Sequence, residues 1–260
     1  MNYEFTGETK VTPSGTVLHR IRALIDMPQR GVQAGDLGGW IESADNLSGN
    51  AQVYGNAWVY GNAQVYGIAQ VYGNARVYGN ARVSGNARVY GNAWVSGNAQ
   101  VSGNAQVYGN AQVYGNAQVY GNERVYGDAQ VSGDARVYGN AWVYGNAWVS
   151  GDAWVCGDAQ VYGDARVYGN AWVSGDAWSQ SPLYIQGSRW SVCMVDYKNL
   201  KIGCQIHSLD EWGKRYKAIA RANNAEDIID EYMLYYNVAV ARYGTKRAPR
   251  EGEASTERKG

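Results

Sequence analysis

Apolar and polar residues alternate with a fixed six-residue period through the middle of the chain. From Val53 to Val173 a valine returns at every sixth position, 21 times without a gap, and an alanine lies two positions before it in every unit but one. Because side chains alternate across a strand, Ala and Val share one face and the residue between them lies on the other. A glycine, followed in almost every unit by Asn or Asp, then provides the backbone that a tight corner needs. The pattern predicts very short strands joined by corners, with Val and Ala inside.

Two architectures are compatible with strands this short. In an antiparallel meander, Val would pair with the variable residue and Tyr with Ala, so both faces would mix apolar and polar side chains. In a parallel coil, Val stacks on Val and the variable residues stack on one another. The parallel coil keeps one face apolar throughout and is therefore the predicted fold.

Three hexads per turn give about 18 residues per coil, the geometry of the triangular left-handed parallel β-helix, an all-β solenoid. Leu47 extends the register by one hexad and Ser179 ends it. The predicted body therefore has about seven coils and, with strands about 4.8 Å apart, a length of about 35 Å. The six-residue period excludes a pentapeptide solenoid, and the single glycine per unit excludes a calcium β-roll, which needs paired glycines in a nonapeptide.

One unit breaks the pattern, since Glu123 stands where alanine is expected. An unpaired carboxylate pointing into the core would cost several kcal/mol. We therefore expect the Glu123 side chain to swing outward at its corner.

Any binding site must lie on the outward positions, and one of these is aromatic along the whole body. The residues that follow valine form three rows along the body, each with members 18 residues apart. In one row the residue is Tyr in every coil, and in the other two rows it is Tyr, Ser or Cys. Rings stacked at strand spacing stabilise a sheet by themselves, so this row is either a self-supporting ladder or a binding strip. The candidate binding residues in the row are Tyr54, Tyr72, Tyr90, Tyr108, Tyr126, Tyr144 and Tyr162.

The variable position between Ala and Val holds only Gln, Arg and Trp in the repeats. Surfaces rich in Trp, Tyr and Arg are typical of interface hot spots, and they also suit stacking on sugars or bases. Trp172 and Trp178 are expected at this outward position near the end of the body. Three further tryptophans, one per face of a single coil, complete the candidate binding residues: Trp142, Trp148 and Trp154.

Both ends of a β-helix have open strand edges that need caps. Residues 1–46, where "TVLHRIRALID" alternates in strand fashion, form the predicted N-terminal β cap, and residues 47–179 form the β-helix. Residues 180–243 are expected to be a C-terminal α+β module with a β-hairpin and two helices. Residues 244–260 form a charged tail that we expect to be disordered.

The predicted hairpin, "RWSVCMVDYKNLKIGCQIHS", turns around Lys198 and Asn199 and would place Cys193 opposite Cys204. The same turn would bring Trp190 near His207. A capping box of Ser208 and Glu211 starts a helix that runs to about residue 223. A second helix, at about 225–243, has an apolar stripe of Ile228, Ile229, Tyr232, Tyr236 and Val240.

Composition adds few constraints on function. The 23 basic and 23 acidic residues cancel, so no global field attracts nucleic acid or an anionic membrane. Three cysteines without CxxC spacing indicate neither a zinc site nor a disulfide framework, and the aspartates at late corners are expected to be solvated turns rather than a metal site. No apolar stretch is long enough for a signal peptide or a membrane span. We expect a soluble protein of a reducing cytoplasm, with no metal and no cofactor.

The opening "LHRIRALIDMPQRGVQAGDLGGWIESADNLSGNAQVYGNAWVYGNA" resembles that of hexapeptide-repeat proteins encoded by tailed phages and prophages, whose relatives are often labelled acetyltransferases. The segment "LKIGCQIHSLDEW" is similar to the C-terminal module of the same proteins. The resemblance covers about residues 16–243. It implies the β-helix fold and a phage context, with the host bacterial cytoplasm or the virion as the location.

Three functions follow as hypotheses. Hexapeptide acyltransferases use a histidine base beside the coil and an extruded loop, but both histidines of this chain, His19 and His207, lie outside the repeats, and no residue is inserted into 21 hexads. We therefore expect a non-catalytic protein that binds, blocks or sequesters a host factor, with counter-defence as one such role. A virion or assembly spacer is the alternative, and an acyltransferase is disfavoured. The expected partners are further copies of the chain, a trimer being favoured, and a host or phage protein, with a small nucleotide or glycan as alternatives and nucleic acid disfavoured.

Overall fold

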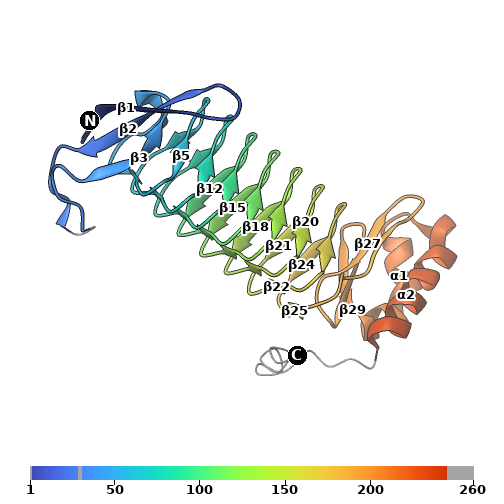
Figure 1. The fold of residues 1–260 in the computed structure, drawn as a ribbon. Coiled ribbons are helices and arrows are strands. Elements are labelled where there is room, and N and C mark those ends of the chain that lie inside the picture. The colour runs from blue at the N-terminus through green and yellow to red at the C-terminus, as the bar shows by residue number, and fades with distance from the viewer. Residues whose placement is uncertain (1, 29–30, 245–260) are drawn as a thin grey trace.

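The computed structural model describes residues 2–28 and 31–244, and Figure 1 shows them as a row of stacked coils between two end structures. The solenoid that the hexad predicts is confirmed: its strands pair in parallel, one coil onto the next, and form three faces. The tail that was expected to be disordered lies, from residue 245 onward, outside the described residues.

Each face takes one strand from every coil. Face I contains β4 (Gln52–Val53), β7 (Gln70–Val71), β10 (Arg88–Val89), β13 (Gln106–Val107), β16 (Arg124–Val125), β19 (Trp142–Val143), β22 (Gln160–Val161) and β25 (Ala177–Trp178). Face II contains β5 (Trp58–Val59), β8 (Arg76–Val77), β11 (Trp94–Val95), β14 (Gln112–Val113), β17 (Gln130–Val131), β20 (Trp148–Val149) and β23 (Arg166–Val167). Face III contains β6 (Gln64–Val65), β9 (Arg82–Val83), β12 (Gln100–Gly103), β15 (Gln118–Gly121), β18 (Arg136–Gly139), β21 (Trp154–Cys156) and β24 (Trp172–Ser174).

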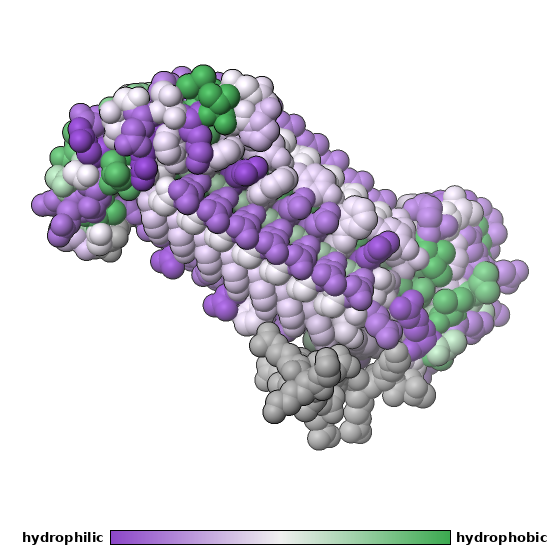
Figure 2. Space-filling model, viewed as in Figure 1, coloured by the Kyte–Doolittle hydropathy of each residue, from purple (hydrophilic) through white to green (hydrophobic). Residues whose placement is uncertain are grey.

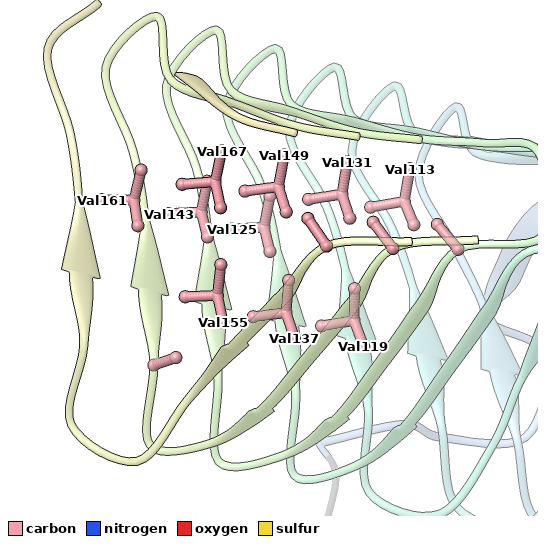
Figure 3. Packing of buried hydrophobic residues seen from close by; sticks show 14 of the residues in the cluster. Val113, Val119, Val125, Val131, Val137, Val143, Val149, Val155, Val161 and Val167 are labelled. Carbon is pink, nitrogen blue, oxygen red and sulfur yellow. The ribbon is translucent and has the colours of Figure 1, made fainter. Parts of the chain in front are cut away.

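The core is a continuous column of small apolar side chains. Equivalent residues pair across coils, as Val89 does with Val107, and every repeat valine from Val59 to Val173 is completely buried. Figure 3 shows these valines pointing inward from all three faces. Full burial of one such side chain is worth about 1.5–3 kcal/mol relative to exposure, so the valine column, together with the buried alanines, stabilises the stack of coils.

Glycine is required at the corners for two physical reasons, which Gly97 illustrates. Its φ of +67° lies in the left-handed region that side chains with a Cβ disfavour. A Cβ at this position would also lie 2.8 Å from the carbonyl oxygen of Gly115 in the next coil. The repeated glycine therefore permits both the turn and the close stacking of successive corners.

The N-terminal cap continues face II rather than covering the end of the solenoid as a separate layer. Strand β2 (Val17–Ala23) pairs antiparallel with both β1 (Tyr3–Val11) and β3 (Leu37–Ile41), and β3 pairs in parallel with β5. The strand predicted in "TVLHRIRALID" is β2. A short 3-10 helix, η2 (Ala44–Asn46), follows, and the buried Asn46 side chain donates to the Gly61 and Ala63 carbonyl oxygens at 2.9 Å.

The last coil corrects one sequence expectation, since Trp178 points inward and not outward. Gln160 pairs with Ala177 and Val161 pairs with Trp178, so the final hexad is one residue shorter than the others. The indole thus occupies a valine position, is completely buried, and stacks on Tyr197 with ring centroids 4.5 Å apart. It closes the C-terminal end of the valine column.

The C-terminal module begins with a four-stranded antiparallel sheet, not a single hairpin. Its strands are β26 (Tyr184–Gln186), β27 (Ser191–Met194), β28 (Asn199–Ile202) and β29 (Gln205–Ser208). The predicted pairing is wrong, because Cys193 lies opposite Lys201 and Cys204 lies in the next turn. The Asp196 carboxylate accepts the Lys198 and Asn199 N–H groups at 2.7 and 2.8 Å, which closes the first turn earlier than expected. Trp190 packs over Gly203, while His207 packs on Trp212 with ring centroids 5.3 Å apart.

Two helices cover this sheet at the far end of the molecule (Figure 1). Helix α1 (Leu209–Ala222) starts as predicted, with the Ser208 hydroxyl accepting the Glu211 N–H. A 3-10 turn, η3 (Glu226–Ile228), leads into α2 (Ile229–Tyr243). Neither these nor any other helix in the described ranges has the length and apolarity needed to span a membrane.

The apolar stripe predicted for α2 is confirmed in part, since Tyr232 is buried and Ile228, Ile229 and Tyr236 pack against the core. Val240 is exposed, whereas the buried positions are Tyr232, Tyr235, Ala239 and Tyr243. The Tyr243 hydroxyl accepts the Leu183 N–H at 2.9 Å, so contacts with the end of the solenoid determine which side of the helix faces inward.

Glu123 also differs from expectation, because its side chain lies inside the solenoid and does not swing out. It is completely buried, and neither carboxyl oxygen has a hydrogen-bond partner. The corner at Gly121 accommodates it: φ of Gly121 is +118°, compared with +71° at Gly115. Neutralisation of the carboxyl is the physical alternative to expulsion, and burial raises the pKa of Glu123 to about 7.

Candidate binding surface

The seven predicted tyrosines form one uninterrupted stack along the edge of face I. Successive ring centroids lie 4.8 to 5.1 Å apart, and neighbouring ring planes are within 7° of parallel. The spacing equals the distance between neighbouring strands in a sheet, so the backbone holds each ring in place. We call this row, Tyr54 to Tyr162, the tyrosine ladder.

The hydroxyl ends of the ladder are neutral hydrogen-bonding groups. Partial burial raises the pKa of Tyr54, Tyr72 and Tyr90, and the nearby Arg88 opposes that rise. Some hydroxyls bond to the neighbouring column, as Tyr90 does to the Gln106 amide oxygen at 3.3 Å. The ladder therefore offers half-exposed ring surface together with polar phenol groups, a combination that suits a partly wet interface.

The three predicted tryptophans lie on three different faces, so they form no common site. Trp142 on face I has the Arg124 guanidinium 4.9 Å from its ring centroid. Trp148 on face II is 38% exposed and donates its indole N–H to Ser132 at 3.1 Å. Trp154 on face III is 36% exposed and meets Trp172 edge to face. Of the ten candidate residues, the seven tyrosines form one continuous row, and Trp142 is the candidate tryptophan that shares their face.

The structure also shows an aromatic column that the analysis of the sequence missed. On face II, Arg76 lies between Trp58 and Trp94, with its guanidinium 4.5 and 5.4 Å from the two ring centroids. Lys10 of the cap lies in the same way between Trp58 and Trp40, at 5.4 and 5.2 Å. The sequence did contain a signal for this column, because its members are spaced 18 residues apart, one per coil: Trp40, Trp58, Arg76 and Trp94. These cation–π contacts fasten the cap to the first coils.

The corners are lined by amide ladders. Most corner Asn side chains donate to the Asn or Asp one coil later, as in the series from Asn62 through Asn80 to Asn98, at 3.1 and 2.9 Å. Late in the body the acceptor becomes Asp, for example Asp134, which accepts from Asn116 at 2.8 Å. Within the described ranges no group of three His, Cys, Asp or Glu side chains is placed to hold a metal ion.

The two histidines are far apart in the molecule. His19 packs on Phe5 in the cap, with ring centroids 5.3 Å apart, and His207 lies 3.2 Å from the Glu211 carboxylate in the C-terminal module. A pocket of about 1150 Å³ opens at the N-terminal end of the solenoid, where Asn46 and Gln52 are among its lining residues. No histidine lines this pocket.

Figure 2 shows hydrophobic colours mainly at the two ends, while the solenoid is polar to neutral on the visible face.

Comparison with known proteins supports the repeat, and the matched segments lie between residues 51 and 175. The chain is similar to the family described as YdcK Beta solenoid repeat, which matches residues 51–67, 69–84, 81–97, 99–115, 105–121, 129–145, 141–157 and 159–175. No curated protein matches the chain. The chain is therefore a β-solenoid repeat protein by both its fold and its sequence.

Proposed function

We propose that this protein is a non-catalytic binding protein that holds a macromolecular partner along its tyrosine ladder. The observation that supports the proposal is the unbroken stack of seven half-exposed rings at 4.8 to 5.1 Å spacing. Tyrosine provides large contact area with little conformational freedom to lose on binding, and it is enriched among hot-spot residues. Identical rungs also offer many equivalent contacts, which raises avidity without new kinds of contact.

The resemblance of the two end segments to phage and prophage proteins suggests the kind of partner. A rigid surface of this type could block or sequester a host factor, and counter-defence is the specific role that we propose. Retention in a virion as an assembly spacer is the alternative, since stacked coils also make a stiff rod of defined length.

Acyl transfer is a weaker proposal for reasons of geometry. The 21 hexads contain no inserted residue from which a loop over a pantetheine arm could form. A general base must reach the acceptor proton within hydrogen-bonding distance, and His19 and His207 lie at opposite ends of the molecule, each outside the coils. We expect any acetyl transfer to survive the double substitution His19→Ala, His207→Ala, and its loss in a folded variant would favour the enzyme.

The test is affinity capture from infected-host lysate with two baits, the native protein and a variant with Tyr108, Tyr126 and Tyr144 replaced by Ser. The exchange is one that the repeat already makes at Ser84, Ser96 and Ser102. A host protein enriched by the native bait and lost with the variant supports the proposal. A phage structural protein captured equally by both baits would instead favour the spacer, with binding at the end structures.

A further inference from the structure

Among the described residues of the repeat, Glu123 is the one side chain of an ordinarily charged type that occupies a buried, inward position. It occupies an alanine position between Asn122 and Arg124 and is completely buried. Neither oxygen has a hydrogen-bond partner among the described residues. A buried carboxyl in this situation avoids the cost of a buried charge only as the neutral acid or by leaving the interior.

The backbone around Glu123 is deformed over three coils. On face III, β12, β15 and β18 are each extended to four residues, and they pair through Gly103, Gly121 and Gly139. The hydrogen bond from Asn122 N–H to the Gly139 oxygen is 3.1 Å long, whereas that from Asn116 N–H to the Gly133 oxygen is 2.8 Å. On the other side, the bond from Asn104 N–H to the Gly121 oxygen is 2.6 Å long, so the corner with the glutamate lies closer to the preceding coil and further from the next one than its neighbours do.

Glycine at 121 makes room for the carboxyl. A Cβ on Gly121 would lie 2.4 Å from the Glu123 Oε1 atom. Because the other repeat corners hold alanine at this inward position and have φ between +60° and +89°, the φ of +118° belongs to the unit with the glutamate. The corner thus has two geometries available to it: the ordinary one of its neighbours, and the deformed one with the side chain inside.

No charged group faces the carboxyl inside the solenoid. The inward residues of the surrounding strands are valine and alanine, including Ala105 and Ala141 at the equivalent positions of the neighbouring coils. The adjacent titratable side chains, Tyr120 and Arg124, lie on outward positions and are exposed. Burial raises the pKa of Glu123 to about 7. The nearby peptide groups of Glu123 and Asn122 oppose the rise, although neither meets the geometry of a hydrogen bond to the carboxyl.

We propose that Glu123 is a protonation-controlled opening point of the solenoid, at the corner formed by residues 120–123. As the neutral acid the side chain stays inside and the corner is closed. When the proton leaves, the carboxylate swings out to water, and the corner separates from the next coil at the hydrogen bond from Asn122 N–H to the Gly139 oxygen. The device lies in the middle of the body, beside Tyr120 and Tyr138 on face III, so opening changes the spacing of outward rings.

The experiment is amide hydrogen exchange of the full-length protein as a function of pH, analysed as protection factors for residues 119–124. With the open form ionised and the closed form protonated, we expect protection to fall about tenfold per pH unit between about pH 5 and 7, and to level off above. Glu123→Ala restores the consensus unit, and Glu123→Gln keeps the size without the proton. Both variants should show pH-independent protection at this corner.

Asp134→Asn is the matched control, because Asp134 lies at an exposed corner and the exchange already exists at Asn116. This control should retain the full pH dependence. Flat protection in the native protein, or the same slope in Glu123→Gln, would overturn the proposal. Isotope-edited infrared spectra at pH 6 provide a second measurement: a protonated carboxyl band lost in Glu123→Gln supports the buried neutral acid, and its absence in the native protein contradicts it.

Discussion

Val107 and Tyr108 are neighbours in the chain and have opposite environments. Val107 is completely buried, while the Tyr108 ring stacks between Tyr90 and Tyr126 with part of its surface in solvent. Because each rung repeats this division, an outward residue can be exchanged with little effect on the core. An inward exchange changes contacts with the coils above and below, and Glu123 is the natural example.

Glu123→Ala should stabilise the protein most at high pH. The pKa of the carboxyl is about 7 in the folded state and 4.5 as its ordinary value, so the folded state binds more protons between these values and stability falls as pH rises. The resulting penalty amounts to at most about 3 kcal/mol above pH 7, less if the side chain escapes outward. Denaturant unfolding of the native protein and of Glu123→Ala at pH 4 and pH 8 measures the difference in their free energies of unfolding. An alanine variant whose gain is equal at both values would contradict the assignment.

At the scale of elements, strands of two to four residues are stable here only through the coils on either side. Each strand pairs with the equivalent strand of both neighbouring coils, as β10 does with β7 and β13. Corners stack in the same way, glycine on glycine. Stability in such an array is approximately a sum of unit and nearest-neighbour terms, so damage at one corner should act mainly through its contact with the next.

A pair of glycine substitutions separates the cost of the turn from the cost of stacking. Gly97 and Gly175 have similar φ values, +67° and +72°, but a Cβ at Gly175 would meet nothing within 4 Å. Gly175→Ala should therefore cost only the left-handed conformation, about 1 kcal/mol. Gly97→Ala adds the overlap with Gly115 and should cost about 3 kcal/mol in total. Thermal midpoints of the two variants give the comparison, and equal losses would show that stacking distance is unimportant.

Periodic elements could be predicted from the sequence, and local exceptions could not. The inward valines and the tyrosine ladder follow from the six-residue period because side-chain direction and phase are fixed by geometry. The position of Trp178 depends on a one-residue shift in strand pairing, which its pairing with Val161 reveals and the unbroken six-residue spacing of the sequence does not. The inward position of Glu123 depends on how far the Gly121 corner can deform, and the hairpin register depends on the Asp196 turn. In each of these cases, contacts with distant parts of the chain select one of several local conformations of similar energy.

At the scale of the whole molecule, the solenoid separates two end structures that differ from it in surface character. The solenoid has polar and aromatic faces, whereas the ends expose aliphatic side chains, among them Val11 and Val17 in the cap and Leu234 and Val238 on α2. Contiguous exposed apolar groups commonly mark interaction sites. The ends are therefore the parts of the molecule that we expect to mediate self-association, and the solenoid faces to remain available for another partner.

We expect the protein to form a homo-oligomer, with a trimer favoured. Replacing Leu234 and Val238 by Ser should lower the assembly state without changing the thermal midpoint of the coils, because both side chains are exposed. Light scattering over a range of concentrations measures the mass. A mass that stays at 28.4 kDa, that of one chain, would refute self-association.

The central claim, that the tyrosine ladder is a binding surface, is tested most directly by measuring partner affinity and thermal midpoint side by side. The protein to compare with the native one has Tyr108, Tyr126 and Tyr144 replaced by Ser, and Trp148→Gln, on another face, is its matched control. Each hot-spot aromatic can contribute about 2 kcal/mol or more to binding, whereas the loss of one exposed cross-strand pair costs under about 1 kcal/mol of stability. We predict a loss of affinity of at least a hundredfold for the triple variant with a small change in midpoint, and no comparable loss for Trp148→Gln. Unchanged affinity with a collapsed midpoint would contradict the account, since the ladder would then serve only to hold the coils together.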